Sequence, residues 1–84
     1  MIKNLPNKMR QDVILKEIDG QHKGKYDFFY LPVDYNNDFA NYGYAFINFI
    51  HPLFILDFKR QFQGKKWREE YNSMKKTELK YGKI

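Results

Sequence analysis

The chain has 84 residues, a length that fits one small domain and leaves no room for a second. With 43% hydrophobic and 30% charged residues, it has the composition of a folded globular domain and not of a disordered chain. The absence of cysteine excludes disulfides, thiolate metal sites and cysteine nucleophiles. No apolar stretch approaches the roughly 20 residues that span a membrane, so we expect no membrane partner.

Aromatic residues are unusually abundant in the chain, and positive charge is concentrated in its last third. Aromatics make up 19% of the chain, more than a core of this size easily absorbs, so some rings must be partly exposed. Residues 1–58 hold six Lys/Arg and seven Asp/Glu, net −1, whereas residues 59–84 hold nine and three, net +6. A basic last third is typical of a surface that faces a polyanion, although an ordinary soluble surface has the same composition.

Hydrophobic periodicity and turn residues predict six elements. In chain order they are a strand over Met1–Leu5, a helix from Lys8 or Arg10 to Gln21, a strand over Tyr26–Val33, a strand over Tyr42–Ile50, a helix that begins at His51–Pro52 and ends at Gly64, and a strand over Thr77–Ile84. The segment Asp34–Asn41 is rich in Asn and Asp and is interpreted as a loop.

The order β-α-β-β-α-β predicts the ferredoxin-like, split βαβ arrangement of the α+β class. It is a four-stranded antiparallel sheet with two helices on one face, the simplest topology that the crossover rules allow for these elements. The second face of the sheet is then left uncovered.

The strand over Tyr42–Ile50 alternates between two sets of side chains. One set, Ala45, Ile47 and Phe49, suits packing under helices, and the other is Tyr44, Phe46 and Asn48. Tyr44 and Phe46 are therefore expected on the open face. Exposed rings can stack nucleic-acid bases, each worth roughly 1–3 kcal/mol, so two rings offer about 2–6 kcal/mol.

The octamer Tyr42–Phe49 resembles the motif K/R-G-F/Y-G/A-F-V-x-F/Y of RNA recognition motif domains. Six positions match, and Ile47 is a conservative change. Tyr42 replaces the basic residue, which removes a phosphate contact at that point. Met1–Leu5 is similar to the shorter companion motif, with Met1 where an aromatic residue is usual.

A narrower resemblance extends over most of the chain. The segments that carry it are Asn4–Lys8, Glu17–Asp19, His22–Pro32, Gly43–Phe49, Pro52–Leu53, Gly64–Trp67, Asn72–Ser73 and Leu79–Tyr81. They are similar to the C-terminal RNA recognition motif of Mei-two-like proteins. The resemblance implies a eukaryotic, intracellular RNA-binding regulator, nuclear or cytoplasmic, with relatives in meiosis and development. It also implies that residues 1–84 are one domain excised from a longer protein.

Within this family frame, the open face binds single-stranded RNA. Phe28, Tyr30 and Pro32 are expected to face outward and Phe29 and Leu31 inward, although alternation alone permits the opposite choice. Leu79 and Tyr81 are expected to pack inward, which leaves lysines beside the rings. The expected RNA-binding residues are Tyr44, Phe46, Phe28, Tyr30, Lys3, Met1, Lys80 and Lys83.

Two other functions stay open. Met1, Tyr42 and the acidic segment Asp34–Asp38 weaken phosphate capture, which favours a protein-interaction module built on the same fold. Small ferredoxin-like folds can also be acyl phosphatases, with Arg10 and Asn41 as the candidates here. No acid/base pair or Gly-rich phosphate loop is present, and His22 and His51 are isolated. We therefore expect a monomeric, non-enzymatic protein that uses no cofactor or metal.

Overall fold

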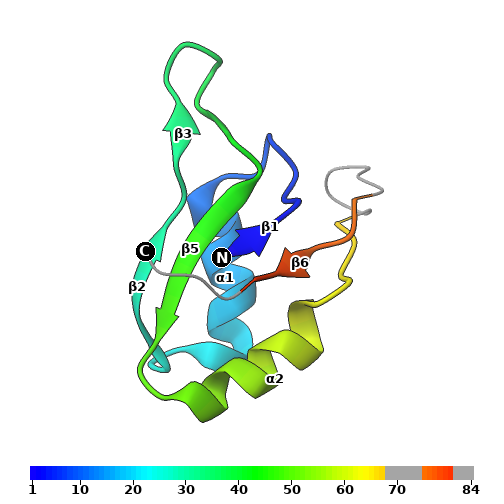
Figure 1. Ribbon diagram of the computed structural model, residues 1–84. Coiled ribbons are helices and arrows are strands. Elements are labelled where there is room, and N and C mark those ends of the chain that lie inside the picture. Colours follow the sequence, from blue (N-terminus) through cyan, green and yellow to red (C-terminus); the bar gives the residue numbers. More distant parts are fainter. Residues whose placement is uncertain (68–74, 81–84) are drawn as a thin grey trace.

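A computed structural model describes residues 1–67 and 75–80 of the chain. Its two helices are α1 (Gln11–His22) and α2 (Pro52–Phe62). The strands are β1 (Ile2–Lys3), β2 (Tyr26–Tyr30), β3 (Val33–Asp34), β4 (Ala40–Asn41), β5 (Tyr44–Phe49) and β6 (Glu78–Leu79). Figure 1 shows β2 and β5 as the long pair, with the β3–β4 hairpin projecting beyond them.

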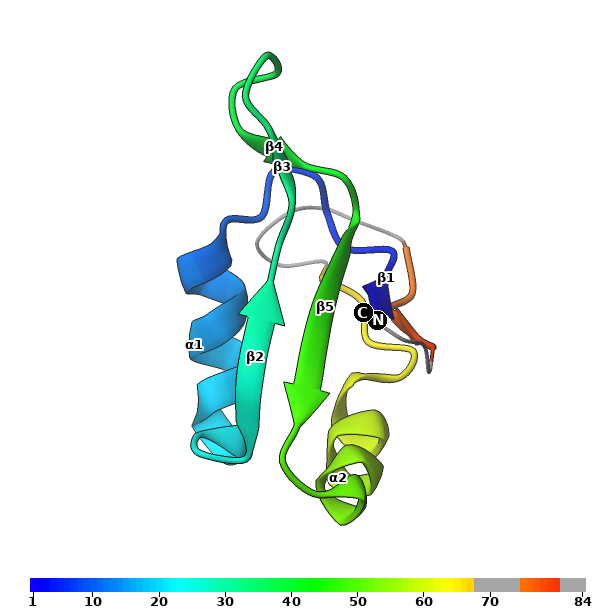
Figure 2. The same ribbon diagram turned by 60° about the vertical axis from the view of Figure 1, so that its left-hand side comes forward.

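Four strands form one antiparallel sheet in the order β2-β5-β1-β6. Both helices lie on the same side of this sheet, as the two ribbon views agree (Figures 1 and 2). The predicted ferredoxin-like, split βαβ fold is therefore confirmed. Because two helices cover one face, the other face of the sheet carries no helix within the described residues.

Several predicted strands are shorter than their sequence pattern suggested. β1 ends at Lys3 because Asn4 adopts a positive φ of 64°, which a strand does not accommodate. β2 ends at Tyr30, before Pro32, which has no N–H to give to a ladder. β6 covers only Glu78–Leu79 of the predicted strand over residues 77–84, and residues 81–84 lie outside the described part of the chain.

The interpretation of residues 34–41 as a plain loop was wrong, because the segment closes the β3–β4 hairpin. The Asp34 carboxylate accepts a hydrogen bond from the Asn36 N–H at 3.0 Å, and the Asp34 carbonyl accepts one from the Asn37 N–H at 3.1 Å. Asp38 and Phe39 then turn the chain with φ values of 51° and 58°. Asn and Asp do favour turns, as predicted, but here the turn joins two paired segments.

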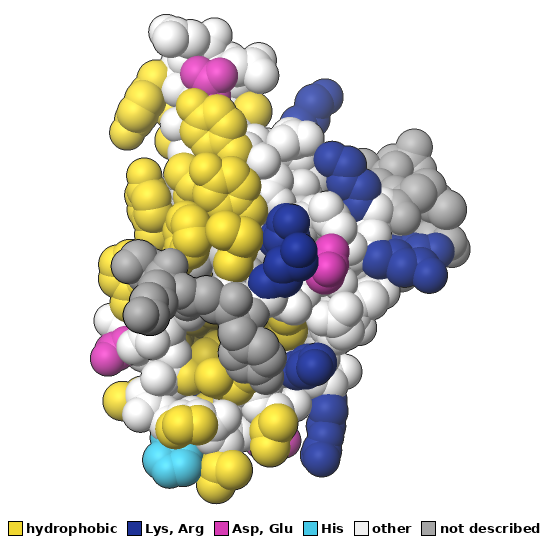
Figure 3. All heavy atoms as spheres, in the orientation of Figure 1, with side chains coloured by type: hydrophobic (Ala, Val, Ile, Leu, Met, Phe, Trp, Pro, Cys, Tyr) yellow, Lys and Arg dark blue, Asp and Glu magenta, His cyan; other side chains and the backbone are white. Residues whose placement is uncertain are grey.

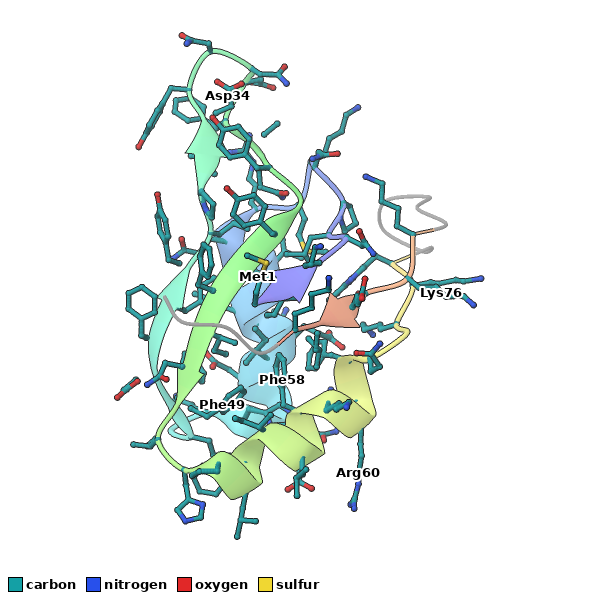
Figure 4. The ribbon with its side chains drawn as sticks, viewed as in Figure 1. Met1, Asp34, Phe49, Phe58, Arg60 and Lys76 are labelled. Carbon is teal, nitrogen blue, oxygen red and sulfur yellow. The ribbon has the colours of Figure 1, made fainter. Side chains whose placement is uncertain are left out.

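The hydrophobic core fills the space between the sheet and the two helices. Its buried members are Ile2, Leu5, Met9, Ile14, Ile18, Leu31, Ala45, Phe58, Phe62 and Trp67. Figure 4 shows Phe49 of β5 and Phe58 of α2 on the same side of the sheet, and their ring centroids are 4.9 Å apart. Trp67 packs beside Phe62 at the end of α2, and its indole N–H donates to Thr77 Oγ1 at 3.0 Å.

Both histidines have structural contacts at helix ends: His22 packs between α1 and α2, and His51 caps α2. His22 is 1% exposed at the end of α1, where its Nε2 lies 2.6 Å from Gln61 Oε1 of α2 and its ring meets Phe58 edge-on at 5.2 Å. His51 caps α2, because its Nδ1 accepts the Leu53 N–H at 3.1 Å. Among the described residues, no group of three or more His, Asp or Glu could hold a metal ion.

Tyr26 links β2 to α1. Its hydroxyl donates to Asp19 Oδ1 at 2.6 Å, and its ring packs against the core. Burial, together with the hydrogen bond to the Asp19 carboxylate and its charge, raises the pKa of Tyr26 to about 12. The protonated phenol is thus favoured in the folded state over an unfolded state in which the pKa is 10.0.

We predict that Tyr26→Phe lowers the free energy of unfolding by about 1 kcal/mol at neutral pH, because the hydrogen bond to Asp19 is lost. The contribution of the phenol proton is fully present below pH 10 and disappears as the pH rises to about 12. The difference between the two proteins should therefore shrink over that interval. Urea denaturation of both at a series of pH values measures it, and a difference that stays constant to pH 12 would contradict the assignment.

Candidate nucleic-acid interface

The open face of the sheet is assembled by strand register. Tyr30 of β2 pairs with Phe46 of β5, and Tyr44 of β5 pairs with Lys3 of β1. Lys3 in turn pairs with Glu78 of β6. Since paired residues share a face, these five side chains lie on the same side of the sheet, opposite the helices.

A β-bulge decides which residues of β2 face outward. Tyr26 pairs with Phe49 and Phe28 with Asn48, so Asp27 is an extra residue between two consecutive pairs. Without it, Tyr26, Phe28 and Tyr30 would share one face. The bulge instead turns Tyr26 inward, where it contacts Phe49 edge-on at 6.5 Å, and leaves Phe28 and Tyr30 outward with exposures of 41% and 53%.

The predicted orientation of β2 is therefore correct for four of its five named residues. Phe28 and Tyr30 are exposed, Phe29 packs against the core and Leu31 is buried. Pro32 was expected outward and is buried instead. It lies beyond the end of β2, so the strand alternation no longer sets its direction, and its carbonyl accepts the Tyr42 N–H at 3.4 Å.

Four outward-facing rings contact one another in a row, which we call the aromatic row: Tyr30, Phe46, Tyr44 and Tyr42. Tyr30 and Tyr42 are exposed, whereas Tyr44 and Phe46 are half-buried. Tyr30 and Phe46 are nearly parallel at 11° with centroids 6.5 Å apart. Tyr44 meets Phe46 edge-on at 5.6 Å, and Tyr42 lies against Tyr44 at 6.4 Å and 27°. Phe28 stands beside this row, next to an Asn48 amide that donates to Asp27 Oδ1 at 2.8 Å. The four rings are thus in continuous contact, with Tyr44 standing nearly perpendicular to Phe46.

Positive charge lies on one side of the aromatic row. Figure 3 shows hydrophobic side chains gathered over β5 and the base of the hairpin, with Lys and Arg on the side of β1 and β6. Lys3 is partly buried beside Tyr44, and Lys80 is exposed. Lys80 is tied to Met1 by two hydrogen bonds: the Met1 amino group donates to the Lys80 carbonyl at 2.8 Å, and the Lys80 N–H to the Met1 carbonyl at 2.9 Å.

The sequence prediction missed one charge on this face. Glu78 lies opposite Lys3 and reduces the positive potential there. Its outward position follows from the inward position expected for Leu79, because successive residues of a strand face opposite sides of the sheet. Lys83 lies outside the described residues, so seven of the eight expected site residues are placed.

Comparison with known sequences identifies the family. Residues 1–84 match RNA recognition motif 2. The chain belongs to this family. It is 54% identical over 84 residues to Protein MEI2-like 2 of Oryza sativa subsp. japonica and 52% identical to Protein MEI2-like 4 of Arabidopsis thaliana. Both alignments cover all of this chain but only 10% and 9% of the relatives.

Membership confirms the resemblance to the RNA recognition motif of Mei-two-like proteins. Such a domain suggests a non-enzymatic role. No helix among residues 1–67 and 75–80 is long and apolar enough to cross a membrane.

In this RNA recognition motif 2 domain, Asn41 fixes the backbone that carries the aromatic row. It is 3% exposed, and its side-chain amide donates to the carbonyls of Pro6 and Met9, each at 2.8 Å. Its side-chain oxygen accepts the Gly43 N–H at 2.7 Å. Asn41, considered above as a phosphatase residue, therefore has its polar side-chain atoms engaged by the backbone. Arg10, the other such residue, is exposed at the start of α1.

We predict that Asn41→Ala lowers the free energy of unfolding by about 3 kcal/mol, because three backbone groups lose a buried partner. Asn41→Asp should be destabilising as well, since a carboxylate cannot donate to the two carbonyls. Asn36→Ala is the matched control: this Asn is exposed in the same hairpin, and we expect a change within about 0.5 kcal/mol. Chemical denaturation measures all three, and equal stabilities of Asn41→Ala and Asn36→Ala would contradict the assignment.

Proposed function

We propose that this domain binds single-stranded RNA on the open face of its sheet, with bases stacked on Tyr44 and Phe46. The observation that carries the proposal is the run of mutually contacting, outward-facing rings on paired strands of an RNA recognition motif. Every base has a π-face, so such rings bind single strands with little dependence on sequence.

Neighbouring residues extend the surface on both sides. Tyr30 lies parallel to Phe46 and offers a second face for a base, and Phe28 stands next along β2. Met1 precedes β1, and extending the β1–β5 register by one residue sets it opposite Phe46, where it supplies a softer apolar contact. Lys3 and Lys80 supply positive charge for phosphates on the β1–β6 side, and Lys83 is proposed to do the same.

We predict that Tyr44→Ala and Phe46→Ala each weaken binding of a short single-stranded RNA by about 1–3 kcal/mol, or roughly five-fold to more than a hundred-fold. Tyr44→Phe keeps the ring and should bind like the parent protein. Leu53→Ala, which changes an exposed residue on α2, serves as the control for nonspecific effects. Fluorescence anisotropy measures the affinity, and circular dichroism verifies the fold. Unchanged affinity in both folded Ala variants would refute stacking on these rings.

A second prediction concerns the phosphate contacts. The logarithm of the association constant should fall with the logarithm of salt concentration, by about 0.7 for each phosphate engaged. Lys80→Ala should reduce this slope by about 0.7, whereas Lys16→Ala, on exposed α1, should leave it unchanged. Titrations at four or more salt concentrations give the slopes. Equal slopes for the parent and Lys80→Ala would remove Lys80 from the interface.

Protein interaction is the second candidate function, and the hairpin favours it. Tyr35 and Phe39 are 76% and 51% exposed, lie edge-on at 5.5 Å, and have the carboxylates of Asp34 and Asp38 beside them in the chain. An acidic aromatic tip suits a protein partner better than a polyanion. Chemical-shift mapping with RNA distinguishes the two: strong shifts at Tyr44 and Phe46 with RNA alone count against this alternative.

A further inference from the structure

Tyr42 is an exposed aromatic residue outside the set of rings proposed above. Its side chain is 54% exposed, and its only described ring contact is with Tyr44, at 6.4 Å and 27°. More than half of the Tyr42 side chain is thus accessible to a planar group. Tyr42 is therefore the end of the aromatic row that lies nearest the β3–β4 hairpin.

The backbone around Tyr42 is held on both sides. The Asn41 N–H donates to the Asn7 carbonyl at 2.9 Å, and the Leu5 N–H donates to the Gly43 carbonyl at 2.9 Å. The buried Asn41 side chain adds the bond to Gly43, whose φ of 88° suits glycine. The backbone at Tyr42 is thus held in place before a ligand binds, so binding to this ring costs little entropy for ordering the backbone.

Tyr42 cannot form the ion pair with a phosphate that a basic residue forms at the first position of the octamer motif. The matching octamer has Lys or Arg there, which can pair with a phosphate, whereas Tyr42 is neutral. From Tyr26 to Phe58 the chain contains no Lys or Arg, and the nearby hairpin carries Asp34 and Asp38. This stretch therefore offers a phosphate no cationic side chain of its own, whereas the Tyr42 ring offers a base a π-face.

We propose that Tyr42 is a stacking residue that binds one more base of the RNA, in place of the phosphate contact that a basic residue makes at this position. The inference rests on the proposed function and extends it: the bound strand continues past Tyr44 to the base of the hairpin. Stacking is nearly independent of salt, whereas a phosphate contact is not. The two roles therefore leave different signatures.

The test uses fluorescently labelled random-sequence RNA of eight nucleotides and the parent protein, Tyr42→Ala, Tyr42→Phe and Tyr42→Lys. We expect Tyr42→Ala to weaken binding by about five-fold or more without changing the salt slope. Tyr42→Phe should bind like the parent. Tyr42→Lys should steepen the slope by about 0.7, because it restores a phosphate contact. A salt slope that falls in Tyr42→Ala would overturn the stacking role.

Two comparisons separate failure of this inference from failure of the proposed function. If Tyr44→Ala and Phe46→Ala lose affinity while folded Tyr42→Ala does not, the inference is overturned and RNA binding by the sheet stands. If none of the three variants loses affinity, both this inference and the proposed function are overturned.

Tyr35→Ala is the matched control, since Tyr35 is an exposed tyrosine in the adjacent hairpin and its described ring contact is with Phe39. A loss in Tyr35→Ala equal to that in Tyr42→Ala would overturn the assignment to Tyr42. Thermal melting confirms that each variant is folded.

Discussion

Pairing between β2 and β5 is the interaction on which the aromatic face depends. β5 supplies Tyr44 and Phe46, but β2 supplies Tyr30 and the register that sets it against Phe46. Among the described residues, β2 lies at the edge of the sheet and pairs with β5 alone, so this one ladder and the packing of its inner residues hold it. Tyr26, through Asp19, ties the same strand to α1. The outer rings thus keep their places because the inner residues of the same two strands are fixed.

The chain distributes its aromatic residues between two tasks. Phe49, Phe58, Phe62 and Trp67 pack with the sheet and helices, with the His22 ring among them. Others remain outward because two helices are too few to cover both faces of four strands. A ring that stays in contact with water in the folded state adds no burial free energy to folding. Retaining several of them in mutual contact on one face is what a binding surface requires.

Much of this arrangement could be predicted from the sequence. The alternation in residues 44–49 specified both faces of β5, and the element order specified the fold, because both follow from local patterns. The bulge at Asp27 could not be foreseen, since adding one residue to a ladder reverses the faces of every later residue and depends on pairing with β5. The network around Asn41 was also missed: its partners, Pro6, Met9 and Gly43, include residues more than thirty positions away. Lone Asn residues give no signal of such contacts.

The Asp27 bulge has a consequence for association between copies of the domain. An edge strand offers unpaired backbone groups to any other chain, and β2 also carries the exposed apolar residues Phe28 and Tyr30. A regular strand with these side chains would be a template for edge-to-edge aggregation. The extra residue interrupts the flat run of donors and acceptors, and its carboxylate places a negative charge at the interruption. The irregularity that turns Tyr26 inward thus also interrupts the edge of the strand that carries Phe28 and Tyr30.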